Sequence, residues 1–85
     1  MPHYAAPRFW PEYNRLTPEM RALADKQFML LKQNHRHPSL DLKKVGNYWS
    51  VRVGSAYRAV GIEIDAGIQW FWIGPHRQYE KLIKS

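Results

Sequence analysis

The sequence has 85 residues, is 45% hydrophobic and 14% aromatic, and carries a formal net charge of +6. This length allows one modest core and excludes two, so we expect a single domain over residues 1–85. The absence of cysteine excludes disulfides, thiol nucleophiles and thiolate metal ligands, and is typical of a reducing compartment. The first ten residues do not resemble a signal peptide and no apolar run could span a bilayer, so we expect a soluble, cytoplasmic protein with no membrane partner.

Helices are predicted in the first 34 residues. The stretch TPEMRALADKQFMLLKQN begins with Thr17, which can cap a helix, followed by a proline and a glutamate that suit the first turn. Its apolar residues recur at the spacing of one helix face. Before it, PRFWPEYNRL predicts a short helix interrupted at Pro11. His3–Ala5 is a candidate for a short edge strand.

After Pro38 the apolar residues alternate, which predicts strands at 41–45, 48–53, 57–64 and 68–73. Gly46-Asn47, Gly54-Ser55 and Asp65-Ala66-Gly67 supply the turns, and Gly74-Pro75 ends the last strand. The final segment, HRQYEKLIKS, predicts a C-terminal helix.

The predicted fold class is therefore α+β: N-terminal helices, then a four-stranded antiparallel meander, then a C-terminal helix. One face of this sheet packs on the helices. The other face is left partly open and is expected to carry Tyr48, Ser50 and Arg52.

The positive charge is concentrated in the centre of the chain. Between residues 26 and 58 there are seven lysines and arginines but a single carboxylate, Asp41, whereas the remaining charges balance. Such asymmetry favours a polyanionic partner, either nucleic acid, an acidic protein or a membrane surface. The alternative is a basic protein that its charge keeps soluble.

A set of candidate functional residues follows from this segment and the C-terminal helix: Lys43, Lys44, Arg52, Arg58, His76, Arg77 and Tyr79. Hairpin connections bring the lysines and arginines onto neighbouring strands. His76 lies at a predicted helix start, where backbone N–H groups favour phosphate. Cleavage of RNA through its 2′-hydroxyl needs a base, an acid and cations that neutralise the phosphorane, and this set supplies them.

Each candidate also has a structural explanation. Lys43 and Lys44 can mark a charged edge strand. Arg58 can form a buried ion pair, with Glu80 or Asp25 as the expected partner. His76 can cap the last helix, and Tyr79 can be a core residue.

A metal site is not expected. His35 and His37 stand two residues apart, but Arg36 between them repels a cation and no acidic third ligand is close in sequence. We expect Arg36 and His37 to contribute to a basic patch, and we predict neither a metal nor another cofactor. Tyr48 is a candidate surface for stacking a base.

The stretch WSVRVGSAYRAV resembles the Y-R strand motif of RelE/ParE-superfamily toxins, the toxin halves of bacterial type II toxin–antitoxin modules. The preceding HPSLDLKKV and the terminal WFWIGPHRQYEKLI resemble the same family, and the likeness covers roughly residues 17–83. For the RelE-like branch, the resemblance implies a metal-independent, ribosome-dependent mRNA endoribonuclease, or mRNA interferase, that inhibits translation.

The resemblance also implies roles for individual residues. Arg58 would stabilise the transition state, and Arg52 with Lys43 or Lys44 would hold mRNA or assist proton transfer. His76 would be the general acid or base, Arg77 a phosphate ligand, and Tyr79 the aromatic that orients the nucleotide. The implied partners are mRNA, the ribosome, and an antitoxin whose acidic segment wraps the basic face, in a heterotetramer or a larger assembly.

Two other functions stay open at this point. Members of the ParE branch share the fold but inhibit DNA gyrase instead of cleaving RNA. A basic module that binds RNA or protein without catalysis would show the same charge pattern.

Overall fold

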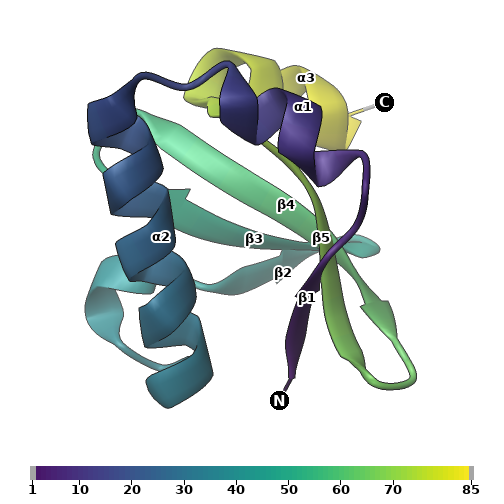
Figure 1. The fold of residues 1–85 in the computed structure, drawn as a ribbon. Coiled ribbons are helices and arrows are strands. Elements are labelled where there is room, and N and C mark those ends of the chain that lie inside the picture. The colour runs from purple at the N-terminus through teal and green to yellow at the C-terminus, as the bar shows by residue number, and fades with distance from the viewer. Residues whose placement is uncertain (1, 85) are drawn as a thin grey trace.

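The computed structural model of the chain describes residues 2–84. Its strands are β1 (His3–Ala5), β2 (Lys43–Val45), β3 (Tyr48–Val53), β4 (Tyr57–Ile64) and β5 (Gly67–Pro75). Its helices are α1 (Phe9–Asn14), α2 (Pro18–Gln33) and α3 (His76–Lys84), with a single 3₁₀ turn, η1, at Pro38–Leu40. In Figure 1, α2 lies along one side of the strands and α3 lies at one end of them.

The sheet has five strands in the order β1-β5-β4-β3-β2. β2 to β5 form the predicted antiparallel meander, so the α+β class is confirmed. The prediction of a four-stranded, wholly antiparallel sheet is wrong, because the candidate edge strand His3–Ala5 is β1 and pairs in parallel with β5. This pairing brings the start of the chain against a strand near its end, so no turn between neighbouring residues predicts it.

The helix ends mostly follow the sequence signals. The Thr17 side chain accepts a hydrogen bond from the Met20 N–H at 3.2 Å and caps α2. The predicted interruption at Pro11 is wrong, since α1 runs unbroken from Phe9 to Asn14. Pro11 lies in the first turn of α1, where the N–H that proline lacks has no partner within the helix.

Two strand boundaries also differ from expectation. β2 begins at Lys43, because Asp41 ends η1 in the left-handed region, with φ of 44°. β5 extends to Pro75, so Gly74-Pro75 does not break the strand but leads directly into α3. An irregular register beside Val60 leaves Phe71 as an extra residue in β5.

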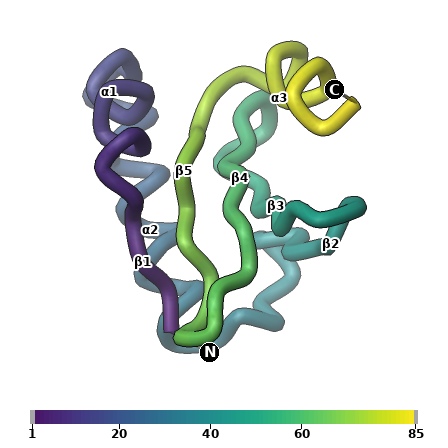
Figure 2. Tube along the Cα trace, turned by 90° about the vertical axis from the view of Figure 1, so that its right-hand side faces the viewer, coloured from purple at the N-terminus to yellow at the C-terminus, as the bar shows by residue number. Residues whose placement is uncertain are grey.

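Two apolar clusters lie on opposite faces of the sheet. The larger one packs Leu31 of α2 against Val51 and Trp70 of the sheet, and the smaller one packs Tyr79 of α3 against Val60. Figure 2 shows α1 and α2 on one side of β5 and β4, and α3 on the other. The face that carries α3 is thus only partly open.

Candidate functional site

The two central lysines lie on opposite faces of the sheet. In the β2–β3 ladder Lys43 is opposite Ser50, whereas Lys44 is opposite Trp49. Successive side chains of a strand point to opposite faces. Lys43 therefore lies on the α3 face beside Ser50, while the Lys44 ammonium is 3.8 Å from the Glu63 carboxylate on the other face.

Arg58 is buried and hydrogen-bonded through all three of its guanidinium nitrogens. Only 4% of the residue is exposed. Nε donates to the Ser50 hydroxyl at 2.6 Å, Nη1 to the Asp41 carboxylate at 3.1 Å, and Nη2 to the Asp41 backbone carbonyl at 2.9 Å. The guanidinium carbon also lies 5.3 Å from the centre of the Tyr79 ring. We call these four residues the Arg58 network.

The predicted alternative of a buried ion pair for Arg58 is therefore present, but the expected partners Glu80 and Asp25 are wrong. The partner is Asp41, 17 positions earlier in the chain. Its hydrogen bond from Arg58 is the main cause that lowers the pKa of the Asp41 carboxyl, and the positive charges of Arg58, Lys43 and Arg52 lower it further. The Asp41 side chain remains 46% exposed, so it is the solvent-facing member of the Arg58 network.

The α3 residues continue the Arg58 network toward solvent. The His76 ring is centred 5.4 Å from the Tyr79 ring, and His76 Nε2 is 2.9 Å from the Glu80 carboxylate. His76 is exposed, but Tyr79 is buried in the smaller apolar cluster. The Tyr79 ring packs on Arg58 and His76, and its role in orienting a nucleotide stays a prediction.

The His76 backbone N–H was expected to favour phosphate at the helix start. That expectation is wrong for this group, because it donates to the Ala56 carbonyl at 2.8 Å. The bond joins the start of α3 to the β3–β4 turn. What His76 offers a ligand is therefore its side chain.

Arg52 and Tyr48 flank the Arg58 network on β3. Arg52 is directly opposite Arg58 in the β3–β4 ladder, is exposed, and donates from Nε to the Ser39 carbonyl at 3.4 Å. Tyr48 is half-buried, with its ring 6.0 Å from that of Phe71. Ser50 between them is fully buried, so the expectation that it lies on an open face is wrong.

Three other predicted residues lie outside this cluster. Arg36 is exposed in the loop after α2, and Arg77 is exposed in the first turn of α3. His37 caps η1, because its Nδ1 accepts the Ser39 N–H at 3.2 Å. Among residues 2–84, no group of three histidine or acidic side chains is arranged to hold a metal ion.

Sequence reasoning missed three residues of this face. Asp41 and Ser50 were not candidates, although Asp41 is the single carboxylate of the basic segment. Arg8 was also missed, and its guanidinium carbon lies 4.3 Å from the centre of the Phe71 ring. No local pattern marks Arg8, because β1 and its parallel pairing with β5 bring it here.

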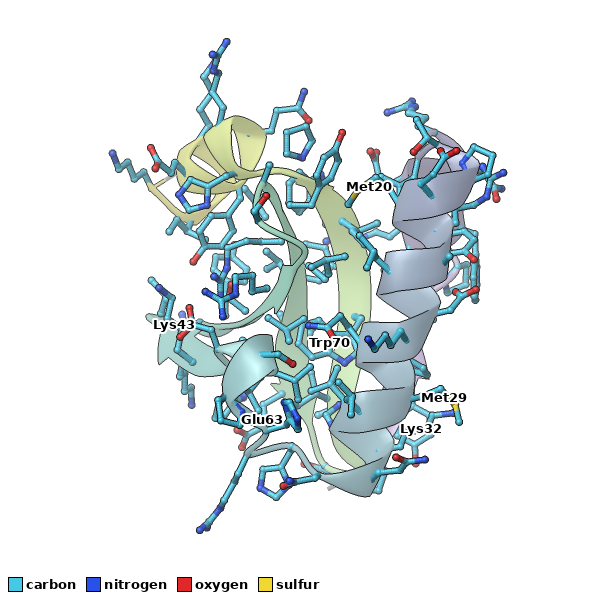
Figure 3. All side chains as sticks on the ribbon, turned by 90° about the vertical axis from the view of Figure 1, so that its left-hand side faces the viewer. Met20, Met29, Lys32, Lys43, Glu63 and Trp70 are labelled. Atoms are coloured by element: carbon cyan, nitrogen blue, oxygen red, sulfur yellow. The ribbon has the colours of Figure 1, made fainter. Side chains whose placement is uncertain are left out.

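The face as a whole combines cations, an imidazole and one half-exposed carboxylate, Asp41. Lys43, Arg52 and Arg58 are drawn together by the β2–β3 and β3–β4 ladders, and α3 adds His76. Such a group can bind a phosphodiester and transfer protons at its edge. Figure 3 shows Lys43 on β2, well separated from Met29 and Lys32 on α2. None of the described helices is long and apolar enough to cross a membrane.

Removing the two partners of the ion pair should have unequal effects on stability. Asp41→Ala leaves the Arg58 charge buried without its counterion, and we expect it to lower the free energy of unfolding by about 3 kcal/mol. Arg58→Met leaves Asp41, which water can solvate, so we expect a smaller loss. Urea unfolding of both variants followed by circular dichroism measures the difference, and a larger loss for Arg58→Met would contradict the proposed asymmetry.

The ion pair also predicts a loss of stability in acid. The folded-state pKa of Asp41 lies below its unfolded value, so its contribution is complete above the ordinary aspartate pKa of about 3.9 and is lost as the pH falls through the folded value. We expect Asp41→Asn to flatten the stability profile below about pH 4. The control is Asp65→Asn in the exposed β4–β5 turn. Urea titrations at each pH measure the free energy of unfolding, and this variant should keep the wild-type dependence of that free energy on pH.

Comparisons with known proteins give matches in structure alone. A scan of protein-family models finds no match, and a search of curated proteins finds none. A chain of the RelB–RelE antitoxin–toxin complex from Methanococcus jannaschii superposes with a TM-score of 0.72 at 17% identity, over 93% of this chain and 96% of that one.

Two structures of the E. coli toxin RelE agree with this match. The isolated toxin gives a TM-score of 0.62 at 18% identity, over 96% of this chain and 94% of that one. A double mutant in the free state gives 0.66 at 18% identity, over 92% of this chain and 85% of that one. The expected likeness is thereby confirmed at the level of structure: this chain has the fold of the RelE toxins.

Proposed function

We propose that this protein is the toxin of a type II toxin–antitoxin module and that it cleaves mRNA on the ribosome without a metal ion. The observation that carries the proposal is the chain of contacts from Arg58 through Tyr79 to His76, on the sheet face that also holds Lys43 and Arg52. The RelE fold supports it, because a solved protein with the same fold is a toxin.

The proposed reaction is a phosphoryl transfer within the RNA strand. The 2′-oxygen loses its proton to a base and attacks the adjacent phosphorus, and the 5′-oxygen leaves with a proton from an acid. The products are a 2′,3′-cyclic phosphate and a 5′-hydroxyl. His76 is an exposed imidazole that suits one of the proton transfers. Lys43 remains a candidate for the other, whereas Lys44 lies on the opposite face.

Arg58 can act on the phosphorane only if the phosphate replaces Asp41. The two anions compete for the same guanidinium, since Asp41 already accepts from Nη1 and Nη2. A phosphodiester carries a full charge and matches the arginine fork as well as a carboxylate does. Arg52 and Lys43 attract a polyanion to this face. The half-exposed position of the Asp41 side chain allows water to solvate its carboxylate once a phosphate replaces it.

The proposed partners follow from the same face. An antitoxin with an acidic segment would cover Lys43 and Arg52 and neutralise them. Two of the structural neighbours are complexes of a RelE toxin with a RelB antitoxin, which supports such a partner here. We place the protein in the cytoplasm, where mRNA and ribosomes are, and expect a heterotetramer or larger assembly with its antitoxin.

One observation favours a second function. All three guanidinium nitrogens of Arg58 are occupied within the chain, as in a structural ion pair. A toxin of the same fold that inhibits DNA gyrase by binding would need no free arginine at this position. In that case Arg58 stabilises the fold and the exposed cations serve binding alone.

The two neighbouring lysines provide a matched test of the proposed RNA-binding face. Lys43→Gln and Lys44→Gln remove the same charge from adjacent exposed positions on opposite sheet faces. We expect Lys43→Gln to weaken binding to a single-stranded RNA and to reduce the slope of log K against log salt concentration by roughly one. Lys44→Gln should leave this slope unchanged. Fluorescence anisotropy at several salt concentrations measures both, and equal effects would place the RNA elsewhere.

Cleavage itself is tested by mapping 5′ ends of one mRNA in a translating extract. We expect ribosome-dependent cuts with the wild type, and cutting slower by about a hundredfold or more with His76→Ala, whose exposed side chain is not needed for the core. Glu80→Ala is the control, because it removes the partner of His76 and leaves the imidazole in place.

Intact mRNA with folded wild-type protein would overturn the nuclease proposal. Supercoiling by purified DNA gyrase is the measurement to make next. Inhibition there by both the wild type and His76→Ala would establish the binding function.

A further inference from the structure

A second site lies on the other face of the sheet. A partly open cavity of about 570 Å³ lies between α2 and the sheet, and residues of β1 and α1 form one side of it. Its walls are almost wholly apolar and include Phe28 and Leu31 of α2 and Val51 of β3. The volume falls within the roughly 300–1,000 Å³ of small-molecule sites.

The entrance to this cavity is apolar as well. Tyr4, Trp10 and Met29 all line it, and they are 44%, 47% and 54% exposed. These side chains come from β1, α1 and α2, and together they form a surface that water solvates poorly. A molecule bound in the cavity would cover them.

His3 in the cavity wall carries an unsatisfied donor. Trp70 Nε1, which can only donate, lies 3.1 Å from His3 Nδ1, so Nδ1 is the acceptor and the ring proton is on Nε2. His3 is 7% exposed, and its Nε2 is the one buried side-chain nitrogen or oxygen recorded without a hydrogen bond among residues 2–84. Burial lowers the pKa of His3 and keeps the ring neutral.

The other polar groups of the wall already have partners. Gln27 Nε2 donates to the carbonyls of Ser39 and Arg52 at 3.2 and 2.8 Å, and the Tyr13 hydroxyl donates to Asp25 at 2.8 Å. No lysine or arginine lines the cavity. An anionic ligand would therefore be buried without a counterion, and Asp25, the carboxylate of the wall, already accepts from Tyr13. A neutral acceptor would instead satisfy the His3 donor.

We propose that this cavity binds a small, flat, apolar molecule with one neutral hydrogen-bond acceptor, such as an aryl ketone, and that His3 Nε2–H donates to that acceptor. The apolar walls bind the body of the molecule and His3 fixes its orientation. This site is independent of the proposed RNA-binding face, because it lies on the α2 side of the sheet.

Two probes of similar shape test the proposal. Acetophenone carries a carbonyl acceptor, and isopropylbenzene replaces it with a methyl-bearing carbon. Titrations of ¹⁵N-labelled protein followed by NMR should show saturable shifts of the Trp70 indole N–H and of Leu31 and Val51 with both probes. The His3 Nε2 resonance should move with acetophenone and not with isopropylbenzene, a difference that needs no variant.

Variants separate the donor from the apolar walls. His3→Phe keeps a flat ring and should weaken acetophenone binding about tenfold while changing isopropylbenzene binding less than about twofold. Trp10→Ala, at an exposed position, should weaken both probes. Absence of shifts at Leu31 and Val51 in the folded wild type would overturn the cavity, and an unmoved His3 Nε2 resonance on acetophenone binding would overturn the role of His3.

Discussion

The buried charge of Arg58 is the constraint on which this face of the protein depends. A guanidinium removed from water needs anions or hydrogen-bond acceptors at every nitrogen. Ser50 of β3 and Asp41 after η1 supply them, and the Tyr79 ring of α3 covers the group. One side chain of β4 thus joins its own strand to three other segments. Asp41 ends η1 in the left-handed region, and from there both its carbonyl and its carboxylate accept hydrogen bonds from Arg58.

The Arg58 network also connects stability with the proposed function. In its present arrangement Arg58 is satisfied, so any phosphate that binds it must offer more than Asp41 does. In the proposed exchange the surrounding cations contribute to that difference, because they attract a polyanion to this face. Because Asp41 is already half exposed, its release would disturb little of the core. The proposed nuclease function requires that a phosphate replace Asp41 at Arg58, whereas the alternative binding function does not.

The sequence reveals local structure well and distant partners poorly. The cap and apolar spacing of α2 and the alternation of β3 and β4 are local signals, and both were predicted correctly. The pairing of β1 with β5, the choice of Asp41 over Glu80 or Asp25, and the position of Arg8 depend on contacts between distant segments. The candidate residues Lys43, Arg52, Arg58, His76 and Tyr79 do gather on one face. The sequence does not predict which of these side chains are buried and which partners they bind, because both depend on contacts between distant segments.

The alternation of side chains along β3 and β4 relates the two proposed sites of the molecule. Ser50 and Arg58 point to the α3 face, and their neighbours Val51 and Ala59 line the cavity on the α2 face. The two sites therefore share the same strand backbones without sharing a side chain. A molecule in the cavity would contact those strands on the α2 face, and a phosphate at Arg58 would contact them on the α3 face. Gln27, which lines the cavity, donates to the backbone carbonyls of Ser39 and Arg52 and so fixes α2 against η1 and β3.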